Sequence, residues 1–267
     1  MIDITKYTSF GNSLADIVRP ILINAYLTGS NYETKEDGSV VTAVDRNVEE
    51  LIRKEINRAY PTHGILGEEF GNERLGSDFI WVVDPIDGTR AFATGIPNFG
   101  CLISLCFEGV PILGIIEIPV GNLRAIGEKG KPTLVNGKTA FTRKCEDLES
   151  AVLSTCHPGA LKERESILNK IRQETYWQFY DGGCVSYISL VRGLLDICID
   201  GNLDPYDFCA LAPVVEGAGG KITDWSGRAL DINSGSRIVA SGTPALHEKI
   251  LISLGDWENK HPPLGGF

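Results

Sequence analysis

The stretch FIWVVDPIDGTRAF, residues 79–92, decides the fold. Its first five residues, 79–83, are apolar and favour β-structure, which predicts a buried strand that ends at Asp84. Pro85 has no amide hydrogen, so we expect the strand to stop there, and Gly88 permits a sharp turn shortly afterwards. The stretch therefore predicts a buried strand that presents polar side chains at its own carboxyl end.

Two aspartates follow this strand, three residues apart. The carboxylates of Asp84 and Asp87 can converge on one point, and carboxylate oxygens are ligands of hard cations such as Mg2+. Gly88 and Thr89 can open a helix whose free backbone N–H groups face the same point and suit an anion. Together these groups are the parts of a metal-assisted phosphate site. A plainer interpretation, in which Asp84 or Asp87 only caps a helix after a turn, stays open.

A second phosphatase chemistry is excluded by one residue. A phosphoaspartyl enzyme of the D-x-D-x-T kind needs a nucleophilic aspartate two residues before Asp87. That position holds Pro85. A metal-activated water is therefore the better candidate for the attacking group.

Composition narrows the class of protein. The 267 residues are 43% hydrophobic, enough for one large domain or two fused ones, and the formal net charge is -10. Such an acidic surface repels nucleic acid and anionic membranes, so we expect neither as a partner. No run approaches roughly 18 apolar residues, and the opening MIDITKYTSF lacks a basic region followed by an apolar one. We therefore expect a cytoplasmic protein and not a membrane or secreted one.

The cysteines and histidines show no disulfide or metal-binding pattern. The cysteines are odd in number, no pair is spaced C-x-x-C, and several lie in apolar runs, which predicts buried free thiols in a reducing compartment. The histidines are scattered, and we expect them to be surface or core residues and not metal ligands. These residues are Cys101, Cys106, Cys145, Cys156, Cys184, Cys198 and Cys209, and His63, His157, His247 and His261.

Hydrophobic periodicity divides the chain into an N-terminal α+β half, about residues 1–150, and a C-terminal α/β half, about residues 151–267. No linker separates them, so we expect one compact unit over 1–267. Pro20 should kink the first helix, and Asp45 and Asp207, each considered alone, are expected to be helix N-caps. Predicted helices cover 9–27, 45–60, 161–172, 182–193, 206–218 and 244–254; further strands cover 39–44, 99–107, 110–118, 151–155, 175–180, 195–200 and 237–241, with a turn at 36–38.

A short strand from Ile65 leads to the adjacent acids Glu68 and Glu69. Adjacent side chains on a strand point to opposite faces, so we expect at most one of the two to point inward. Considered alone, such an acid pair is usually solvated.

Four separated segments occur in an order that is typical of a known family. They are Thr42-Ala-Val-Asp45, Gly67-Glu-Glu69, Trp81-Val-Val-Asp-Pro-Ile-Asp-Gly-Thr89, and Tyr206-Asp207 with Gly217-Ala-Gly-Gly220 downstream. Over roughly residues 10 to 255 the chain resembles the inositol monophosphatase family of magnesium-dependent, lithium-sensitive phosphatases. The resemblance implies a layered αβαβα sandwich, usually a homodimer, that hydrolyses a small phosphate ester.

The resemblance also implies a role for each acid. Glu68, Asp84 and the backbone carbonyl of Ile86 would hold the first of two to three Mg2+ ions. Asp84, Asp87 and Asp207 would hold the second, and a third, weaker ion would contact Glu68. Thr89, oriented by Asp45, would help Glu68 to position and deprotonate the attacking water. The implied substrate-binding residues are Asp87, Gly88, Thr89, Arg90, Asp200 and Asp207.

Details around these segments narrow the substrate. The chain has Asp87-Gly-Thr-Arg90-Ala-Phe92 where inositol monophosphatases typically continue D-G-T-T-N-F, and Leu203-Asp-Pro-Tyr-Asp207 where they have a Trp-Asp pair. These features resemble the histidinol-phosphate phosphatase branch, which acts late in histidine synthesis. Asp200 falls where the family contacts the polar body of the substrate, and Arg90 is either a marker of the branch or a surface cation. Two alternatives stay open: a phosphatase of inositol 1-phosphate or another sugar phosphate, and a catalytically silent metal-binding module.

Overall fold

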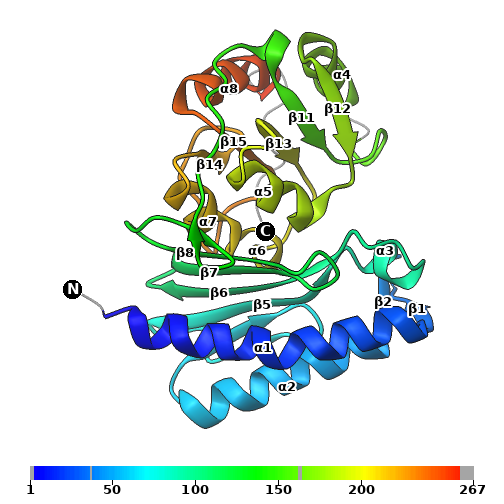
Figure 1. Cartoon of the computed structure of the whole chain (residues 1–267), viewed down its shortest axis with the longest axis vertical. Coiled ribbons are helices and arrows are strands. Elements are labelled where there is room, and N and C mark those ends of the chain that lie inside the picture. Colours follow the sequence, from blue (N-terminus) through cyan, green and yellow to red (C-terminus); the bar gives the residue numbers. More distant parts are fainter. Residues whose placement is uncertain (1–2, 37, 162–163, 259–267) are drawn as a thin grey trace.

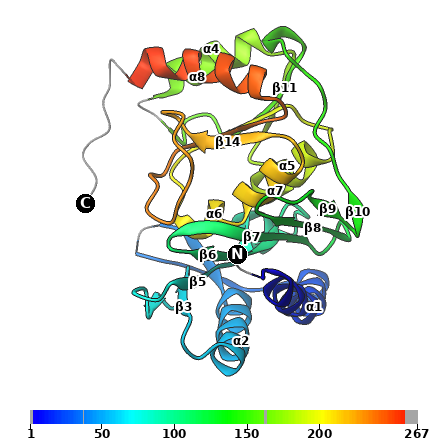
Figure 2. The ribbon, with the colours of Figure 1, turned by 90° about the vertical axis from the view of Figure 1, so that its left-hand side faces the viewer.

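Five layers of secondary structure stack along the long axis of the molecule (Figure 1). The structure, a computed structural model, describes residues 3–36, 38–161 and 164–258. Helices α1 (Thr5–Thr28) and α2 (Ala43–Ala59) form the first layer, and an eight-stranded sheet forms the second. The third layer holds α5 (Gly183–Val191), α6 (Pro205–Phe208) and α7 (Leu211–Gly217), the fourth is a five-stranded sheet, and the fifth holds α4 (Glu165–Glu174) and α8 (Pro244–Glu258). Figure 2 shows the same order from the side, so the predicted αβαβα sandwich is confirmed.

The large sheet has the strand order β10-β9-β8-β7-β6-β5-β3-β4. Only β3 and β5 pair in parallel, and the other neighbours are antiparallel. The strands are β3 Gly64–Gly67, β4 Asn72–Glu73, β5 Phe79–Asp87, β6 Gly100–Phe107, β7 Val110–Ile118, β8 Leu123–Glu128, β9 Leu134–Val135 and β10 Lys138–Thr139. The predicted hairpin of 99–107 and 110–118 is therefore confirmed as β6 and β7.

Strand β5 lies inside the sheet with both faces covered. Trp81 and Val83 pack into the core under α1 and α2, whereas Ile80 and Val82 pack into the core under α5 and α7. This alternation follows from the two-residue period of a strand. Because both faces are buried, the strand reads as an unbroken apolar run and holds its carboxyl end in a fixed place.

The strand is longer than the sequence predicts. It continues through Pro85 to Asp87, and its pairing with β6 shifts register between Asp84, which faces Leu102, and Asp87, which faces Gly100. Pro85 lies in this bulge, where the ladder needs no amide from it, so the expectation that Pro85 ends the strand is wrong. The bulge is followed by the short helix α3 (Thr89–Ala93).

The small sheet has the strand order β12-β11-β13-β15-β14. Strand β11 pairs in parallel with β12 and β13, whereas β15 is antiparallel to β13 and β14. The strands are β11 Val152–Thr155, β12 Trp177–Tyr180, β13 Ile197–Asp200, β14 Lys221–Asp224 and β15 Ile238–Ser241. All but β14 are predicted, and β14 is missed because a four-residue strand with Lys221 and two polar residues gives little pattern.

The helix predicted over 206–218 is two helices, α6 and α7. Pro213 explains the break, since its nitrogen cannot donate to the carbonyl of Cys209 and its ring would clash there. The break also lets the chain lie directly on the large sheet. A Cβ on Gly114 would stand 1.9 Å from the carbonyl oxygen of Ala210, and one on Gly127 would stand 2.4 Å from that of Pro213. These two glycines therefore let the segment from Ala210 to Pro213 lie directly against β7 and β8, in the same sheet as the bulge of β5.

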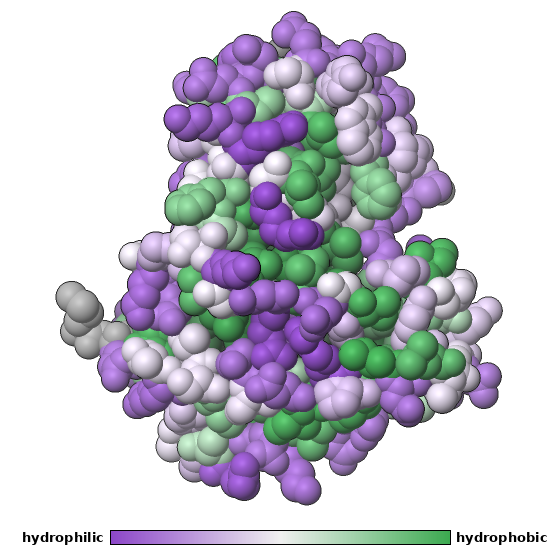
Figure 3. All heavy atoms as spheres, in the orientation of Figure 1, coloured by the Kyte–Doolittle hydropathy of each residue, from purple (hydrophilic) through white to green (hydrophobic). Residues whose placement is uncertain are grey.

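The two halves of the chain share a core. Ile80, Leu102 and Ile116 of the large sheet belong to the same buried cluster as Tyr187 and Val214 of the C-terminal half. Figure 3 shows apolar side chains gathered mainly around the middle of the face, where the halves meet. The outline is notched above the lobe that holds α3 and the two-stranded sheet of β1 (Tyr32–Thr34) and β2 (Val40–Thr42). The two halves are thus packed together within the described residues, and one unit over 1–267 stays a prediction.

Several smaller predictions have clear outcomes. The first helix is confirmed and contains Pro20. All seven cysteines are free, and only Cys156 is less than fully buried. The predicted strand 39–44 is shorter, since α2 already begins at Ala43. Positions 37, 162–163 and 261, which belong to a predicted turn, a predicted helix and a histidine, lie outside the described residues. Within the described chain, each helix is too short or too polar to cross a membrane.

Candidate metal centre

Three carboxylates from distant parts of the chain meet at the end of β5. Asp84, Asp87 and Asp207 each offer an oxygen, and these oxygens lie within 4.8 Å of one another. Asp84 and Asp87 flank the bulge of β5, and Asp207 lies in α6. The structure thus brings together three of the four acids that the sequence predicts as metal ligands.

Asp84 is the buried corner of this cluster. Its side chain is 1% exposed, and its Oδ1 accepts a hydrogen bond of 2.9 Å from the amide of Ile86. Burial raises the pKa of Asp84 well above its usual range, and the charges of Glu68, Asp87 and Asp207 raise it further. The local turn therefore fixes one oxygen of Asp84, close to three other carboxylates whose charges act on it.

Asp87 is held from the C-terminal half of the chain. The amide of Cys184, at the start of α5, donates to its Oδ2 over 2.5 Å. Gly183 must be glycine here, because its φ is 47° and a Cβ would stand 2.7 Å from the same oxygen. Burial raises the pKa of Asp87, and the hydrogen bond from Cys184 opposes that rise. The contact between Asp87 and α5 places the acid at the junction of the two halves.

Asp207 and Asp45 hold equivalent positions in two helices. The N-cap of α6 is Asp204 and the N-cap of α2 is Thr42, so the expectation that Asp45 and Asp207 are N-caps is wrong. Each is the third residue of its helix, and its carboxylate accepts the amide of the N-cap residue in a capping box. The Asp204 amide donates to Asp207 Oδ2 over 2.7 Å, which leaves Oδ1 for another ligand.

Burial and the charge of Asp87 raise the pKa of Asp207 well above its usual range. Burial also raises the pKa of Asp45, whose side chain is inaccessible to solvent, although hydrogen bonds from Thr42 and Thr89 oppose the rise. The two capping boxes therefore fix both acids at the cost of keeping their charges out of water.

Thr89 links Asp45 to the bulge. Its hydroxyl lies 2.8 Å from the carbonyl oxygen of Ile86 and 3.3 Å from Asp45 Oδ1. A threonine hydroxyl has one hydrogen, so it can donate to only one of these two oxygens at a time. The Ile86 oxygen keeps a second lone pair for a cation. Thr89 is 9% exposed and stands at the first position of α3.

Glu68, the fourth predicted ligand, follows β3 and is bound differently. Its Oε1 lies 3.3 Å from Lys35 Nζ, and the same ammonium lies 2.7 Å from Glu69 Oε1. Since both acids reach one cation, the expectation that at most one points inward is wrong. The reason is that β3 ends at Gly67, before the alternation of a strand could apply. Burial raises the pKa of Glu68 to about 7, against the opposing effect of Lys35.

The donor set fits a hard divalent cation. Asp84, Asp87 and Asp207 offer only oxygens, the charge of Asp87 raises the pKa of both Asp84 and Asp207, and a cation between the three would remove that repulsion. Oxygen-only sets of this kind suit Mg2+ and Ca2+, not softer metals. The histidines at positions 63 and 247 take no part in it. His63 accepts from the Trp81 indole, and His247 contacts Thr223 and Ser241.

The other predicted substrate-binding residues, Gly88, Asp200 and Arg90, differ in their contacts and in their exposure to solvent. Gly88 has a φ of 88°, and a Cβ there would stand 2.6 Å from the carbonyl oxygen of Asn98, so the tight turn requires glycine. Asp200 ends β13, and its Oδ2 accepts from the Tyr187 hydroxyl over 2.8 Å. Burial raises its pKa to about 6, and the charges of Asp87 and Asp181 add to this effect. Arg90 is exposed on α3.

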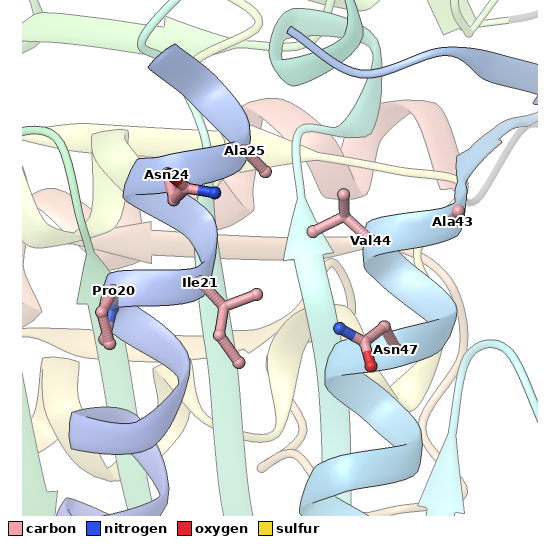
Figure 4. A pocket seen from close by; sticks show the side chains of 7 residues that line it. All are labelled: Pro20, Ile21, Asn24, Ala25, Ala43, Val44 and Asn47. Atoms are coloured by element: carbon pink, nitrogen blue, oxygen red, sulfur yellow. The ribbon is translucent and has the colours of Figure 1, made fainter. Parts of the chain in front are cut away.

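A groove of ≈ 660 Å³ lies elsewhere, between α1 and α2 (Figure 4). Ile21 and Ala25 face Val44 and Asn47 across it. Its lining has no ionisable side chain, so it offers nothing for phosphate chemistry.

Lys35, Cys184 and Tyr187 are missed by the sequence analysis. Lys35 stands before a turn and is far in sequence from the acids that it contacts. Cys184 acts through its backbone amide, which every residue except proline carries. Tyr187 lies on α5 with its ring in the core. None of the three has a local signal, since each depends on contacts between distant segments.

Comparisons with known proteins find similar sequences and a similar fold. A sequence profile described as the inositol monophosphatase family matches residues 3–256. The bifunctional chloroplastic phosphatase IMPL2 of Arabidopsis thaliana is 37% identical over 96% of this chain and 76% of its own length. A histidinol-phosphatase of Chlorobaculum parvum is 32% identical over 84% of this chain and 87% of its own. The structure of an inositol monophosphatase from Zymomonas mobilis superposes with a TM-score of 0.86 at 36% identity, covering 96% of this chain and 100% of that one.

Proposed function

The chain belongs to the inositol monophosphatase family of phosphomonoesterases, and we propose that within this family it hydrolyses histidinol phosphate to histidinol and phosphate, a step of histidine biosynthesis. The family acts on small phosphate esters and is generally metal-dependent. The names of relatives do not decide the substrate, since relatives at similar identity act on different esters. The choice depends on the wall of the site that would face the alcohol part of the ester.

An acidic wall beside Asp87 is the observation that carries this choice. The carboxylates of Asp87 and Asp181 lie close enough to Asp200 for their charges to raise its pKa. At neutral pH a group with a pKa of about 6 is mostly ionised, so this wall favours a cationic substrate. Histidinol carries an ammonium group, whereas inositol is an uncharged polyol. The Tyr187 hydroxyl holds Asp200 in place from behind.

The centre proposed here uses Asp84, Asp87, Asp207, Glu68 and the Ile86 carbonyl to hold two to three Mg2+ ions. Bound there, the ions would acidify a water molecule and neutralise the oxygen of the departing alcohol. The positions of the three aspartates, two in the bulge and one in a capping box, support this assignment.

The chain's own groups would complete the reaction. Glu68 would take the proton of the attacking water, and Thr89, oriented by Asp45, would hold that water in line with the phosphorus atom. The amides of Gly88 and Thr89, at the start of α3, would bind the phosphate oxygens. Arg90 is proposed as a marker of the substrate branch, since it is exposed at the rim of the same helix.

Phosphate release from histidinol phosphate and inositol 1-phosphate tests the proposal directly. We expect kcat/KM to be at least about tenfold higher for histidinol phosphate, which equals about 1.4 kcal/mol of transition-state binding. Faster turnover of inositol 1-phosphate would make the chain an inositol or sugar-phosphate phosphatase instead. Tight Mg2+ binding without hydrolysis of any phosphate ester would identify it as a silent metal-binding module.

Replacing Asp200 tests the acidic wall. Asp200→Ala should raise KM for histidinol phosphate about tenfold, because an ammonium loses its counter-charge, and should leave the Mg2+ requirement unchanged. Asp200→Asn is the matched control for the hydrogen bond: like Asp200→Ala it removes the charge, but it keeps an oxygen that can accept from Tyr187. A changed Mg2+ requirement would instead assign Asp200 to the metal centre.

We also propose a homodimer in the cytoplasm. The edge strand β12 and the residue before it expose Tyr176, Trp177, Phe179 and Tyr180, an aromatic run that water disfavours. Trp177→Glu with Phe179→Glu should halve the mass in sedimentation, whereas Leu27→Glu, at an even more exposed apolar residue of α1, should not. An unchanged mass would place the contact elsewhere. Seven free thiols support a reducing compartment, although the Arabidopsis relative is chloroplastic.

A further inference from the structure

A buried carboxylate on α2 contacts the turn that carries Glu68. Glu49 is inaccessible to solvent, and its Oε2 accepts the amide of Glu69 over 2.7 Å while its Oε1 accepts that of Phe70 over 3.2 Å. An isolated buried carboxylate is costly, so each of these bonds counts. The amides on the far side of Glu68 are therefore satisfied by a helix side chain and not by water.

Arg53, the counter-ion of Glu49, binds the same turn. Arg53, one helical turn further along α2, donates from Nε to Glu49 Oε1 over 2.7 Å and is 6% exposed. Its Nη2 donates to the carbonyl oxygen of Gly71, and its Nη1 lies 2.8 Å from Glu73 Oε1. The ion pair thus holds both limbs of the turn 68–71, the outgoing limb by Glu49 and the returning limb by Arg53.

Gly67 shows how closely the end of β3 approaches the Glu49–Arg53 ion pair. A Cβ at this position would stand 2.1 Å from Glu49 Oε1 and 2.8 Å from Arg53 Nη2. Only glycine lets the end of β3 approach the carboxylate this closely, and Glu68 is the next residue. The placement of Glu68 is therefore coupled to the position of the Glu49 side chain.

The same face of α2 also contacts α3, on another side of the site. Asp45 lies four residues before Glu49, so the two side chains stand one above the other on the helix. Asp45 reaches Thr89 on α3, and Glu49 reaches the turn after β3. Helix α2 thus contacts both Thr89 and the turn that carries Glu68, the two groups that the proposed reaction assigns to the attacking water.

We propose that Glu49 is a positioning residue that holds the turn 68–71 so that Glu68 faces Asp84, a role that rests on the proposed function. It touches neither substrate nor metal. By holding the turn, Glu49 sets the distance between Glu68 and the aspartates. Because Asp45 lies on the same helix and contacts Thr89, the positions of Glu68 and Thr89 are fixed relative to each other.

Glu49→Gln tests this role, since glutamine keeps the shape but loses the charge that binds two amides and a guanidinium. We expect kcat on the preferred ester to fall about tenfold to 100-fold, with KM changed less than about threefold and half-saturating Mg2+ raised several-fold. Hydrogen exchange at Glu69 and Phe70 should accelerate at least about tenfold while the circular dichroism spectrum stays native. Glu50→Gln, at the exposed neighbouring residue, should change none of these.

A folded Glu49→Gln protein with faster exchange at the turn but native kcat and Mg2+ dependence would overturn the proposal. So would a loss of kcat without any change of exchange at Glu69 and Phe70. If Glu49→Gln does not fold, Gly67→Ala gives the same test, because it keeps both charges and displaces the turn from them. A Gly67→Ala enzyme with native kcat and Mg2+ dependence would equally overturn the role.

Binding of Mn2+, measured by calorimetry, separates this inference from the proposed function. Should the wild-type chain hydrolyse no phosphate ester, the function is lost, yet Glu49→Gln is still expected to weaken Mn2+ binding several-fold. Unchanged Mn2+ affinity in the folded variant would contradict the role of Glu49 whatever the substrate.

Discussion

The two sides of the candidate metal centre are built in different ways. Asp84, Asp87 and Asp207 are held by backbone amides, in a bulge, against α5 and in a capping box. Glu68 is held by charges, with Lys35 on its carboxylate and the Glu49–Arg53 pair behind its turn. The aspartates belong to buried elements and Glu68 belongs to a turn. The fold itself therefore fixes the three aspartates, whereas the position of Glu68, the proposed water-activating acid, depends on an ion-pair network.

Asp84→Asn should have the largest effect, because it removes the ligand at the buried corner. We expect kcat to fall at least about 1000-fold, equal to about 4 kcal/mol, with a native circular dichroism spectrum. Asp78→Asn, an exposed acid that directly precedes the same strand, is the control and should be fully active. An unfolded Asp84→Asn protein would show that the acid serves the structure and not the reaction.

Glu68→Gln should have a smaller effect and would sharpen the comparison. Because the three aspartates still bind a cation without it, we expect kcat to fall about 100-fold while Mn2+ still binds at the aspartates. The measurement is kcat together with a Mn2+ titration. If Glu68→Gln abolished all Mn2+ binding, the two sides would form one inseparable ligand set.

The smallest expected effect is on stability in the absence of metal. Asp84, Asp87 and Asp207 have raised pKa values in the folded protein, and that of Glu68 is about 7. The folded state therefore binds more protons than the unfolded state above about pH 4, so stability falls as pH rises through the raised values. In a chelator, we expect Tm to drop by several degrees between about pH 5 and 8, and Mg2+ to restore it.

Asp84→Asn checks the source of this pH effect. In chelator at about pH 8, the variant should melt above the wild type, because it removes one of the repelling charges. A lower Tm than wild type under these conditions would mean that the carboxylate of Asp84 stabilises the metal-free fold.

Much of the fold is readable from local pattern, since the apolar alternation of β5 and the periodicity of α1 depend on neighbouring residues. The bulge at Pro85 is not, because a proline that ends a strand and one that sits in a bulge look alike without the pairing partner. The break before α7 follows from Pro213 and could have been predicted. The strand β14 gives too little pattern to be seen.

The candidate site likewise has residues whose meeting can be predicted from local sequence and residues whose meeting cannot. Asp84 and Asp87 lie in one motif, so their meeting is predictable from spacing alone. Asp207 joins them only through the approach of Ala210, just after α6, to Gly114, which no local pattern reveals, and the resemblance to a family supplies it instead. The contacts of Glu68 with Lys35, and of its turn with Glu49, have no sequence signal, because an acid and a base far apart in the chain carry no mark of their pairing.

Anomalous scattering from crystals grown with Mn2+ and phosphate tests the central claim most directly. We expect manganese between Asp84, Asp87 and Asp207, with the phosphate against the amides of Gly88 and Thr89. Ordered phosphate with no manganese among these three carboxylates, or manganese bound only elsewhere on the molecule, would contradict it.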